Sequence, residues 1–107
     1  MPPIDITNIS AHAFNDRKER IAQIQAVGMG TPIAVIKEID TQGHSVSKTL
    51  TSTGVIVIRN NENMIITLYL AEIHQAVKIF RENYGKIRLP DDIYNKILLN
   101  NIMFPAA

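Results

Sequence analysis

The chain predicts an α+β domain in which an N-terminal helix precedes a four-stranded antiparallel meander sheet and two C-terminal helices follow it. Near the start of the chain, apolar residues recur with the helical period of about 3.6. The period then changes to two over a long middle stretch, which three short turns divide into four runs. A helical period returns after the last run, and the short turns favour antiparallel neighbours over crossover connections.

Length and composition favour a single domain that spans residues 1–107. The chain has 107 residues, of which 46% are hydrophobic, so it can bury a core without metal ions or disulfides. It contains no cysteine, which excludes disulfides, thiolate zinc sites and thiol nucleophiles. No apolar run approaches the roughly 20 residues that span a bilayer, and the N-terminus lacks a signal-peptide pattern. We therefore expect a cytoplasmic protein without membrane contact.

The first helix is expected over residues 11–27. Residues 1–9 contain two prolines and are expected to form an extended lead-in, after which Ser10 is the expected N-cap. Glycines and a proline within residues 28–32 end the helix. Together with the sheet, this helix makes up an expected core unit of residues 10–70.

Four strands are expected at residues 33–40, 45–50, 55–58 and 64–70. The run over residues 55–58 is apolar at every position, which is typical of a strand buried on both faces. Alternation within the first two runs places a lysine among apolar residues on one side of each strand: Lys37 with Ile33, Val35 and Ile39, and Lys48 with Val46 and Leu50.

Two helices are expected in the C-terminal part, residues 71–107. The first covers residues 71–84 and ends at a glycine. The second begins at Pro90, a favoured first-turn residue, and three of its apolar residues are expected to face inward: Ile93, Ile97 and Leu98. Further apolar residues make this helix apolar beyond one face, which a monomer rarely exposes: Leu99, Ile102, Met103 and Phe104.

Charge and motifs exclude several function classes. Eleven lysines and arginines against ten acidic residues leave a net charge of +1, so nucleic-acid binding would need a local basic cluster. The histidines His12, His44 and His74 lack the short spacing that places two ligands on one helix face, so no metal site is expected. The chain has neither a glycine-rich phosphate loop nor a nucleophile elbow. We expect no cofactor.

Candidate chemistry is concentrated on the first helix. At about 100° per residue, His12, Asp16 and Arg20 lie along one edge, and Arg17 lies on the other side of the apolar stripe. One interpretation is a solvated rim in which Asp16 pairs with Arg20. The other is a metal-independent ribonuclease site, because histidine can act as base or acid and arginine binds phosphate through a planar fork.

Hydroxyl groups of the strands could complete this site. Thr51 and Thr53 lie at a strand end, whereas Thr67 and Tyr69 share one face of the last strand, with Ile65 beside them. A buried hydroxyl needs a hydrogen-bond partner, so two hydroxyls on one side of an apolar strand hint at function. The alternative for Tyr69 is a core aromatic ring with its hydroxyl at the rim. The residues assigned to substrate binding are Arg17, Thr51, Thr53 and Tyr69.

The chain also resembles the barnase, EndoU, colicin D and RelE group of ribonuclease folds, in particular small members of toxin or mobile-element type. The resemblance covers about residues 10–70, and its segments lie on the first helix and the last hairpin: Ala11-His12-Ala13, Glu19-Arg20-Ile21, Thr53-Gly54-Val55-Ile56-Val57-Ile58 and Ile65-Ile66-Thr67-Leu68-Tyr69. It implies a catalytic site that contains His12, Arg20 and Thr67.

The chain departs from the pattern of that group at three points. Arg17 lies one residue later than the usual first arginine of the helix. Ala22 replaces the glycine that is expected after the second arginine. The two C-terminal helices lie beyond the shared part.

Two functions from different classes follow. The first is a metal-independent endoribonuclease-like toxin or effector domain of a phage or mobile element, which acts on RNA and is neutralised by an antidote protein. Such a domain would cleave RNA but not DNA, which lacks the 2′-hydroxyl. The second is a non-catalytic phage- or plasmid-encoded interaction module, whose C-terminal helices form a homo-oligomer or bind a protein. The balanced charge favours the second function, and the resemblance favours the first.

Overall fold

Four strands form one antiparallel sheet in the order β1-β2-β3-β4, so each strand pairs with its neighbour in the sequence. The computed structural model describes residues 18–85 and 88–105. The strands are β1 (Pro32–Ile39), β2 (Ser45–Thr51), β3 (Val55–Arg59) and β4 (Ile65–Leu70). The helices are α2 (Lys18–Val27), α3 (Ile73–Tyr84) and α4 (Asp91–Met103). The predicted α+β meander with one helix before the sheet and two helices after it is therefore confirmed.

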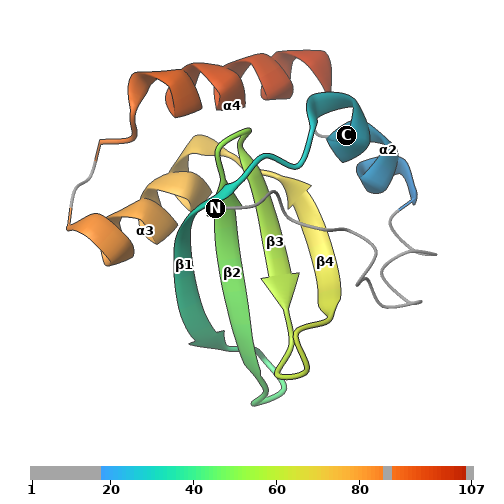
Figure 1. Cartoon of the computed structure of the whole chain (residues 1–107), viewed down its shortest axis with the longest axis vertical. Helices are drawn as coiled ribbons and strands as arrows, with labels where there is room; N and C mark the ends of the chain where they lie inside the picture. The colour runs from blue at the N-terminus through green and yellow to red at the C-terminus, as the bar shows by residue number, and fades with distance from the viewer. Residues whose placement is uncertain (1–17, 86–87, 106–107) are drawn as a thin grey trace.

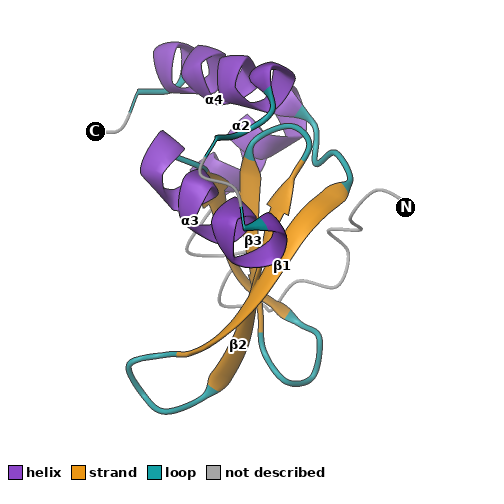
Figure 2. Cartoon of the chain, turned by 90° about the vertical axis from the view of Figure 1, so that its left-hand side faces the viewer, coloured by secondary structure: helices purple, strands orange, loops and turns teal. Residues whose placement is uncertain are grey.

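Helices cover both faces of the sheet (Figure 1). Helix α3 packs on one face above β1 and β2, and α2 packs on the other face beside β4. Helix α4 crosses the end of the sheet where β2 ends and β3 begins, and Figure 2 shows it above the same end from a perpendicular direction. We call the two sides of the sheet the α3 face and the α2 face.

Two buried clusters hold these layers together. The cluster on the α3 face includes Ala34, Ile36, Leu50, Ile56, Ala76, Ile79, Ile93 and Ile97. The cluster on the α2 face consists of Ile21, Ile24, Val55, Val57, Ile65 and Leu68. Strand β3 contributes to both clusters because its alternate side chains point to opposite faces. This confirms the prediction that it is buried on both sides.

Two apolar residues of β1, Val35 and Ile39, do not face the core. Val35 is 43% exposed and Ile39 is 65% exposed, whereas Ala34 and Ile36 are buried. The buried pair lies on the α3 face, where α3 packs against β1. The exposed pair lies on the α2 face, and α2 packs beside β4 at the opposite edge of the sheet.

The inward side of α4 includes Asn100 instead of Leu98. Ile93 and Ile97 are buried as predicted, but Leu98 is 40% exposed, so the prediction for this residue was wrong. Residues 93, 97 and 100 follow the helical period, whereas Leu98 is rotated by about 100° from its neighbour. Asn100 is buried, and its Nδ2 donates a hydrogen bond of 2.9 Å to the carbonyl oxygen of Thr53.

The turn between β2 and β3 joins several parts of the chain. Thr31 N–H donates to Ser52 Oγ at 3.0 Å, and Ser52 N–H donates to the Thr31 carbonyl at 2.9 Å. Ala71 N–H donates to the Gly54 carbonyl at 2.8 Å. With the asparagine bond from α4, these contacts connect the start of β1, the link to α3 and the last helix at one turn.

The last turn of α3 covers part of the free edge of β1. Asn83 Oδ1 accepts a hydrogen bond of 2.9 Å from Val35 N–H, and Asn83 Nδ2 donates to the Val35 carbonyl. The Tyr84 hydroxyl donates to the Ile33 carbonyl. Phe80 packs against the Tyr84 ring with a centroid separation of 4.6 Å. These contacts hold the C-terminal end of α3 along the edge strand.

The glycine in the β2–β3 turn provides a test of this packing. Gly54 has a φ of +83°, and a Cβ atom at this position would lie 2.8 Å from Ile97 Cγ1 of α4. Gly43 has a φ of +82° but no heavy atom within 4 Å of the same position. Alanine is strained by the positive φ at both sites, but only Gly54→Ala also pushes against α4. We expect Gly54→Ala to lower the free energy of unfolding by about 1–3 kcal/mol more than Gly43→Ala, which is the usual effect of overpacking. Urea unfolding measures both losses, and equal losses would contradict the close approach of α4.

Candidate functional site

Thr67 and Tyr69 lie on the α3 face of β4. Thr67 pairs with Ile58 and Tyr69 pairs with Ile56, and both isoleucines pack in the cluster under α3. Ile65 pairs with Arg59, so the next residue along β4 has no partner and forms a β-bulge. The bulge places Ile65 in the cluster on the α2 face. The expectation that Ile65 lies beside Thr67 and Tyr69 is therefore wrong, because strict alternation does not continue through a bulge.

Arg20 comes from a helix on the other side of the sheet. Helix α2 packs on the α2 face through Ile21 and Ile24, and Arg20 is exposed. The helix that carries Arg20 and the side chain of Thr67 therefore lie on opposite faces of the sheet. Burial raises the pKa of the Tyr69 hydroxyl, and the positive charges of Lys48 and Arg20 oppose this effect. Arg20 thus influences Tyr69 electrostatically, although its helix covers the opposite face.

Two predicted site residues, His12 and Arg17, lie outside the described residues. The structure therefore neither adds them to a site nor removes them from one. Among the residues that the structure describes, the predicted site is represented by Arg20, the two strand-end threonines and the pair on β4.

The hydroxyls of Thr51 and Thr53 are engaged in the turn between β2 and β3. Thr51 is fully buried, and its Oγ1 accepts a hydrogen bond of 3.1 Å from Val55 N–H. Thr53 Oγ1 lies 3.1 Å from Thr51 Oγ1 and donates to the Gly28 carbonyl at 2.6 Å. These bonds tie the turn to the end of α2. The two threonines therefore serve the turn, and the structure does not bring them together with the pair on β4.

Tyr69 lies in a cleft of about 160 Å³ between α3 and the α3 face of the sheet. Its other lining residues are Ile36, Glu38, Lys48, Ile56, His74, Gln75, Lys78 and Ile79. No hydrogen bond to the Tyr69 hydroxyl is formed within the described part of the chain. A phenolic O–H in a partly apolar cleft is a donor that a ligand can use.

Glu38 carries the electrostatics of this cleft. Its Oε2 lies 3.0 Å from Lys48 Nζ, and its Oε1 lies 2.8 Å from Lys78 Nζ, so each carboxylate oxygen meets one lysine. Hydrogen bonds from Lys78 and Lys48 lower the pKa of Glu38, and the bond to Glu38 raises the pKa of Lys78. The carboxylate and its two ammonium partners together carry one net positive charge.

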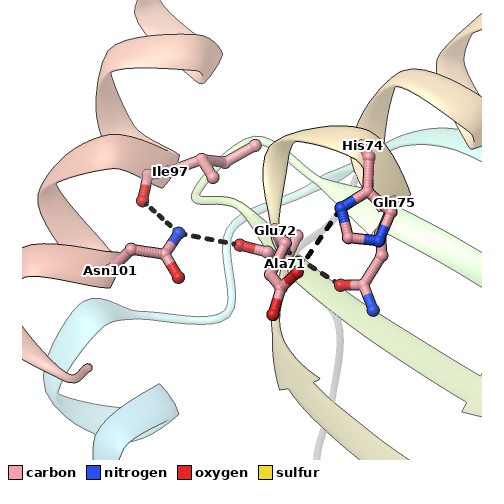
Figure 3. Close-up of polar contacts among 6 residues, drawn as sticks. All are labelled: Ala71, Glu72, His74, Gln75, Ile97 and Asn101. Carbon is pink, nitrogen blue, oxygen red and sulfur yellow. Dashed lines mark hydrogen bonds and ion pairs between the residues drawn. The ribbon is translucent and has the colours of Figure 1, made fainter. Parts of the chain in front are cut away.

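His74 lies at the mouth of the cleft in the first turn of α3. Its side chain is 75% exposed, and its Nδ1 lies 3.4 Å from Glu72 Oε2 (Figure 3). It precedes Lys78 by four residues, so the two side chains lie on the same side of the helix. Gln75 Oε1 accepts a hydrogen bond of 2.9 Å from Glu72 N–H and thereby caps the start of α3. The side chain of His74 therefore projects from a capped N-terminal turn of α3.

Sequence reasoning missed Glu38, Lys78 and the position of His74. One sequence signal was available, because Lys48 alternates with Val46 and Leu50 and so lies on the apolar side of its strand. A lysine among buried residues predicts a nearby carboxylate. The identity of that carboxylate depends on the β1–β2 register, in which Glu38 pairs with Val46, next to Lys48 along the same face.

Within residues 18–85 and 88–105 there is neither a candidate metal site nor a membrane-crossing helix. These residues contain no group of three or more histidine, aspartate or glutamate side chains that could hold a metal ion. Their helices also lack the length and apolar character that a membrane-crossing helix needs.

Comparison of the chain with protein-family models, with curated proteins and with solved structures finds no match.

The ion pairs of Glu38 predict a specific pH dependence of stability. A carboxyl group whose pKa is lowered in the folded state stabilises the fold above its ordinary value of 4.5, and this contribution is lost as the pH falls through the lowered value. We expect Glu38→Gln to unfold more easily than the parent at neutral pH, and the difference to shrink in acid. Urea unfolding at neutral and acidic pH measures the difference, with Glu62→Gln in the exposed β3–β4 turn as control. A difference that stays constant in acid would mean that the Glu38 charge does not stabilise the fold.

Proposed function

We propose that the chain is a metal-independent ribonuclease-like domain of toxin or effector type from a phage or mobile element, and that it acts in the cytoplasm. The observation that carries this proposal is the cleft in which Glu38 lies between Lys48 and Lys78 beside the free hydroxyl of Tyr69. RNA cleavage without a metal needs a base, an acid and a cation, and Glu38, His74 and the two lysines of this cleft can fill these roles.

The reaction would be an intramolecular displacement at phosphorus. Glu38 takes the proton of the 2′-hydroxyl while the 2′-oxygen forms a bond to phosphorus. His74, in its protonated form, gives a proton to the 5′-oxygen as the bond between that oxygen and phosphorus breaks. Lys48 and Lys78 stabilise the charge on the phosphoryl oxygens. The products are a 2′,3′-cyclic phosphate and a free 5′-hydroxyl.

The charge of the cleft suits one phosphodiester group. Glu38 and its two lysines carry one net positive charge, and a phosphodiester carries one negative charge. A phosphate that binds the lysines takes over hydrogen bonds that Glu38 now accepts, which frees a carboxylate oxygen to act as base. The lowered pKa of Glu38 keeps it ionised for that role, and the raised pKa of Tyr69 keeps its hydroxyl a donor.

Tyr69 belongs both to this cleft and to the site expected from the sequence. The other residues of the cleft were not part of the expected site. The charge of Arg20 acts on Tyr69, so this arginine can attract RNA towards the cleft even though its helix covers the other face. Thr67 lies on the same face as Tyr69 and can contact a nucleotide that extends along β4. An antidote protein would neutralise the activity by covering the mouth of the cleft at His74.

A second candidate function is a non-catalytic interaction module from a phage or plasmid. It is favoured by the apolar residues that α4 exposes to solvent, since such a surface marks an interaction site in most proteins. This function makes no use of the cleft and is compatible with a small net charge.

Cleavage assays on RNA and on DNA of the same sequence, with a metal chelator present, test the nuclease proposal. We expect cleavage of RNA alone, because the attacking 2′-hydroxyl is missing from DNA. Glu38→Gln is expected to lower the rate by about 10²–10⁴-fold, the usual effect of losing a general base. Glu62→Gln is the matched control and is expected to cleave at the parent rate.

Two results would contradict the proposed site, and a third would contradict the nuclease proposal as a whole. RNA cleavage at the full rate by Glu38→Gln would remove the cleft from the mechanism. Loss of cleavage in His12→Ala together with full cleavage in His74→Ala would move the acid–base chemistry to the N-terminal helix. No cleavage of any RNA by the folded parent protein would end the nuclease proposal and leave the interaction module.

A further inference from the structure

Helix α4 presents an apolar face to solvent. Five of its large apolar side chains are between 40% and 76% exposed: Tyr94, Leu98, Leu99, Ile102 and Met103. Three of them, Tyr94, Leu98 and Ile102, are spaced four residues apart and so form a stripe along the helix. The charged residues of α4 are confined to its first half, at Asp91, Asp92 and Lys96. The second half of the helix has no charged side chain.

The stripe continues into an open groove between α3 and α4. The groove has a volume of about 600 Å³, and Ile73, Val77 and Leu98 supply its apolar lining. Leu98 belongs to both the stripe and the groove. On the α3 side, the groove is bordered by three groups that can carry positive charge, His74, Lys78 and Arg81, and by Glu72.

One end of the groove is held by a hydrogen bond from α4 to the link that precedes α3 (Figure 3). Asn101 Nδ2 donates to the Ala71 carbonyl at 3.1 Å and to the Ile97 carbonyl at 2.8 Å. The C-terminal half of α4 therefore lies beside the start of α3, and the two helices run in roughly opposite directions. The groove is preformed, because the bond to Ala71 ties α4 to the link before α3 without an added partner.

We infer that a second copy of this chain occupies this surface, with the two α4 helices antiparallel across a two-fold axis near Leu98. The stripe is symmetric about this residue, because Tyr94 and Ile102 lie four residues to either side of it. A two-fold axis at Leu98 therefore sets Tyr94 of each copy against Ile102 of the other and brings the two Leu98 side chains together. This inference deepens the second candidate function and does not depend on the chemistry of the cleft.

The charges of α4 select the antiparallel arrangement. Parallel helices would place the acidic first turns, Asp91 and Asp92, side by side, and like charges repel. Antiparallel helices separate these turns by about 20 Å, the length of a 13-residue helix. Each acidic turn then lies against the uncharged end of the other α4 and near the end of the groove where His74 stands. The opposed helix dipoles add to the attraction.

A second copy must reach the groove as well as the stripe to form a stable interface. A stable interface buries about 800 Å² of each partner, which is more than one side of a single helix offers. An isologous contact uses both the stripe and the groove of each copy, so α4 of one copy lies between α3 and α4 of the other. The resulting contact resembles a four-helix packing with one continuous apolar centre.

Sedimentation equilibrium of the full chain over a concentration series tests this inference. We expect the parent protein to reach twice its chain mass of 12.0 kDa. Ile102→Glu and Leu98→Glu are each expected to raise the Kd of the dimer by at least about 30-fold, the effect of losing a central contact. Ile39→Glu is the matched control, because Ile39 is 65% exposed on β1, away from α4, and it is expected to leave the dimer unchanged.

Single cysteines test the orientation, since the chain has no cysteine of its own. Under oxidation, Leu98→Cys is expected to cross-link to its own copy, and Ile102→Cys is expected to cross-link to Tyr94→Cys in a mixture but not to itself. Self-cross-linking of Ile102→Cys at the same rate would overturn the antiparallel arrangement.

A parent protein that stays monomeric at high concentration, or that pairs only with a different protein, would overturn the inference. So would a dimer that Ile102→Glu and Leu98→Glu leave intact. The RNA-cleavage rate of Ile102→Glu separates the two proposals. At concentrations at which both proteins are monomeric, we expect it to equal the parent rate in a nuclease, because Ile102 does not line the cleft.

Discussion

The arrangement of the helices depends on the hydrogen bonds that the turn between β2 and β3 forms with other parts of the chain. Its residues bond to the end of α2 through Thr53, to the start of β1 through Ser52, and to α4 through Asn100. Gly54 accepts the N–H of Ala71 just before α3 and leaves room for Ile97 of α4. A turn of four residues therefore contacts every described helix or the segment beside it, which explains why its hydroxyls all form hydrogen bonds.

This position of the helices brings two surfaces to α3. The cleft lies between α3 and the sheet, and the groove lies between α3 and α4. His74 and Lys78 line both of them. A molecule bound in the groove would therefore contact the same two side chains that border the cleft. The two proposed functions use different surfaces, but these surfaces share residues on one helix.

Hydrophobic periodicity was sufficient to predict the elements and their order, because each strand pairs with its neighbour and each turn is short. It failed at two points that depend on tertiary packing, and it did not indicate which side of β1 faces the core. Leu98 is exposed because α4 meets the rest of the chain through Ile97 and Asn100. Ile65 changes face because of a bulge, which the alternation of residue types does not reveal. The β1 residues Val35 and Ile39 are exposed because α2 packs at the other edge of the sheet. The cleft shows the same limit, since the Glu38 contacts need the register of two strands and the placement of α3 together.

The side chains at the end of α3 also decide how the sheet can meet other chains. An edge strand with free backbone groups is a template for strand addition, and it is a common start for aggregation. Asn83 and Tyr84 occupy the outward backbone groups of Val35 and Ile33, so that half of the β1 edge cannot accept a strand from another molecule. Association that extends the sheet is thereby blocked at this half of the β1 edge. A contact between helical surfaces can close after two copies instead of growing into a fibre.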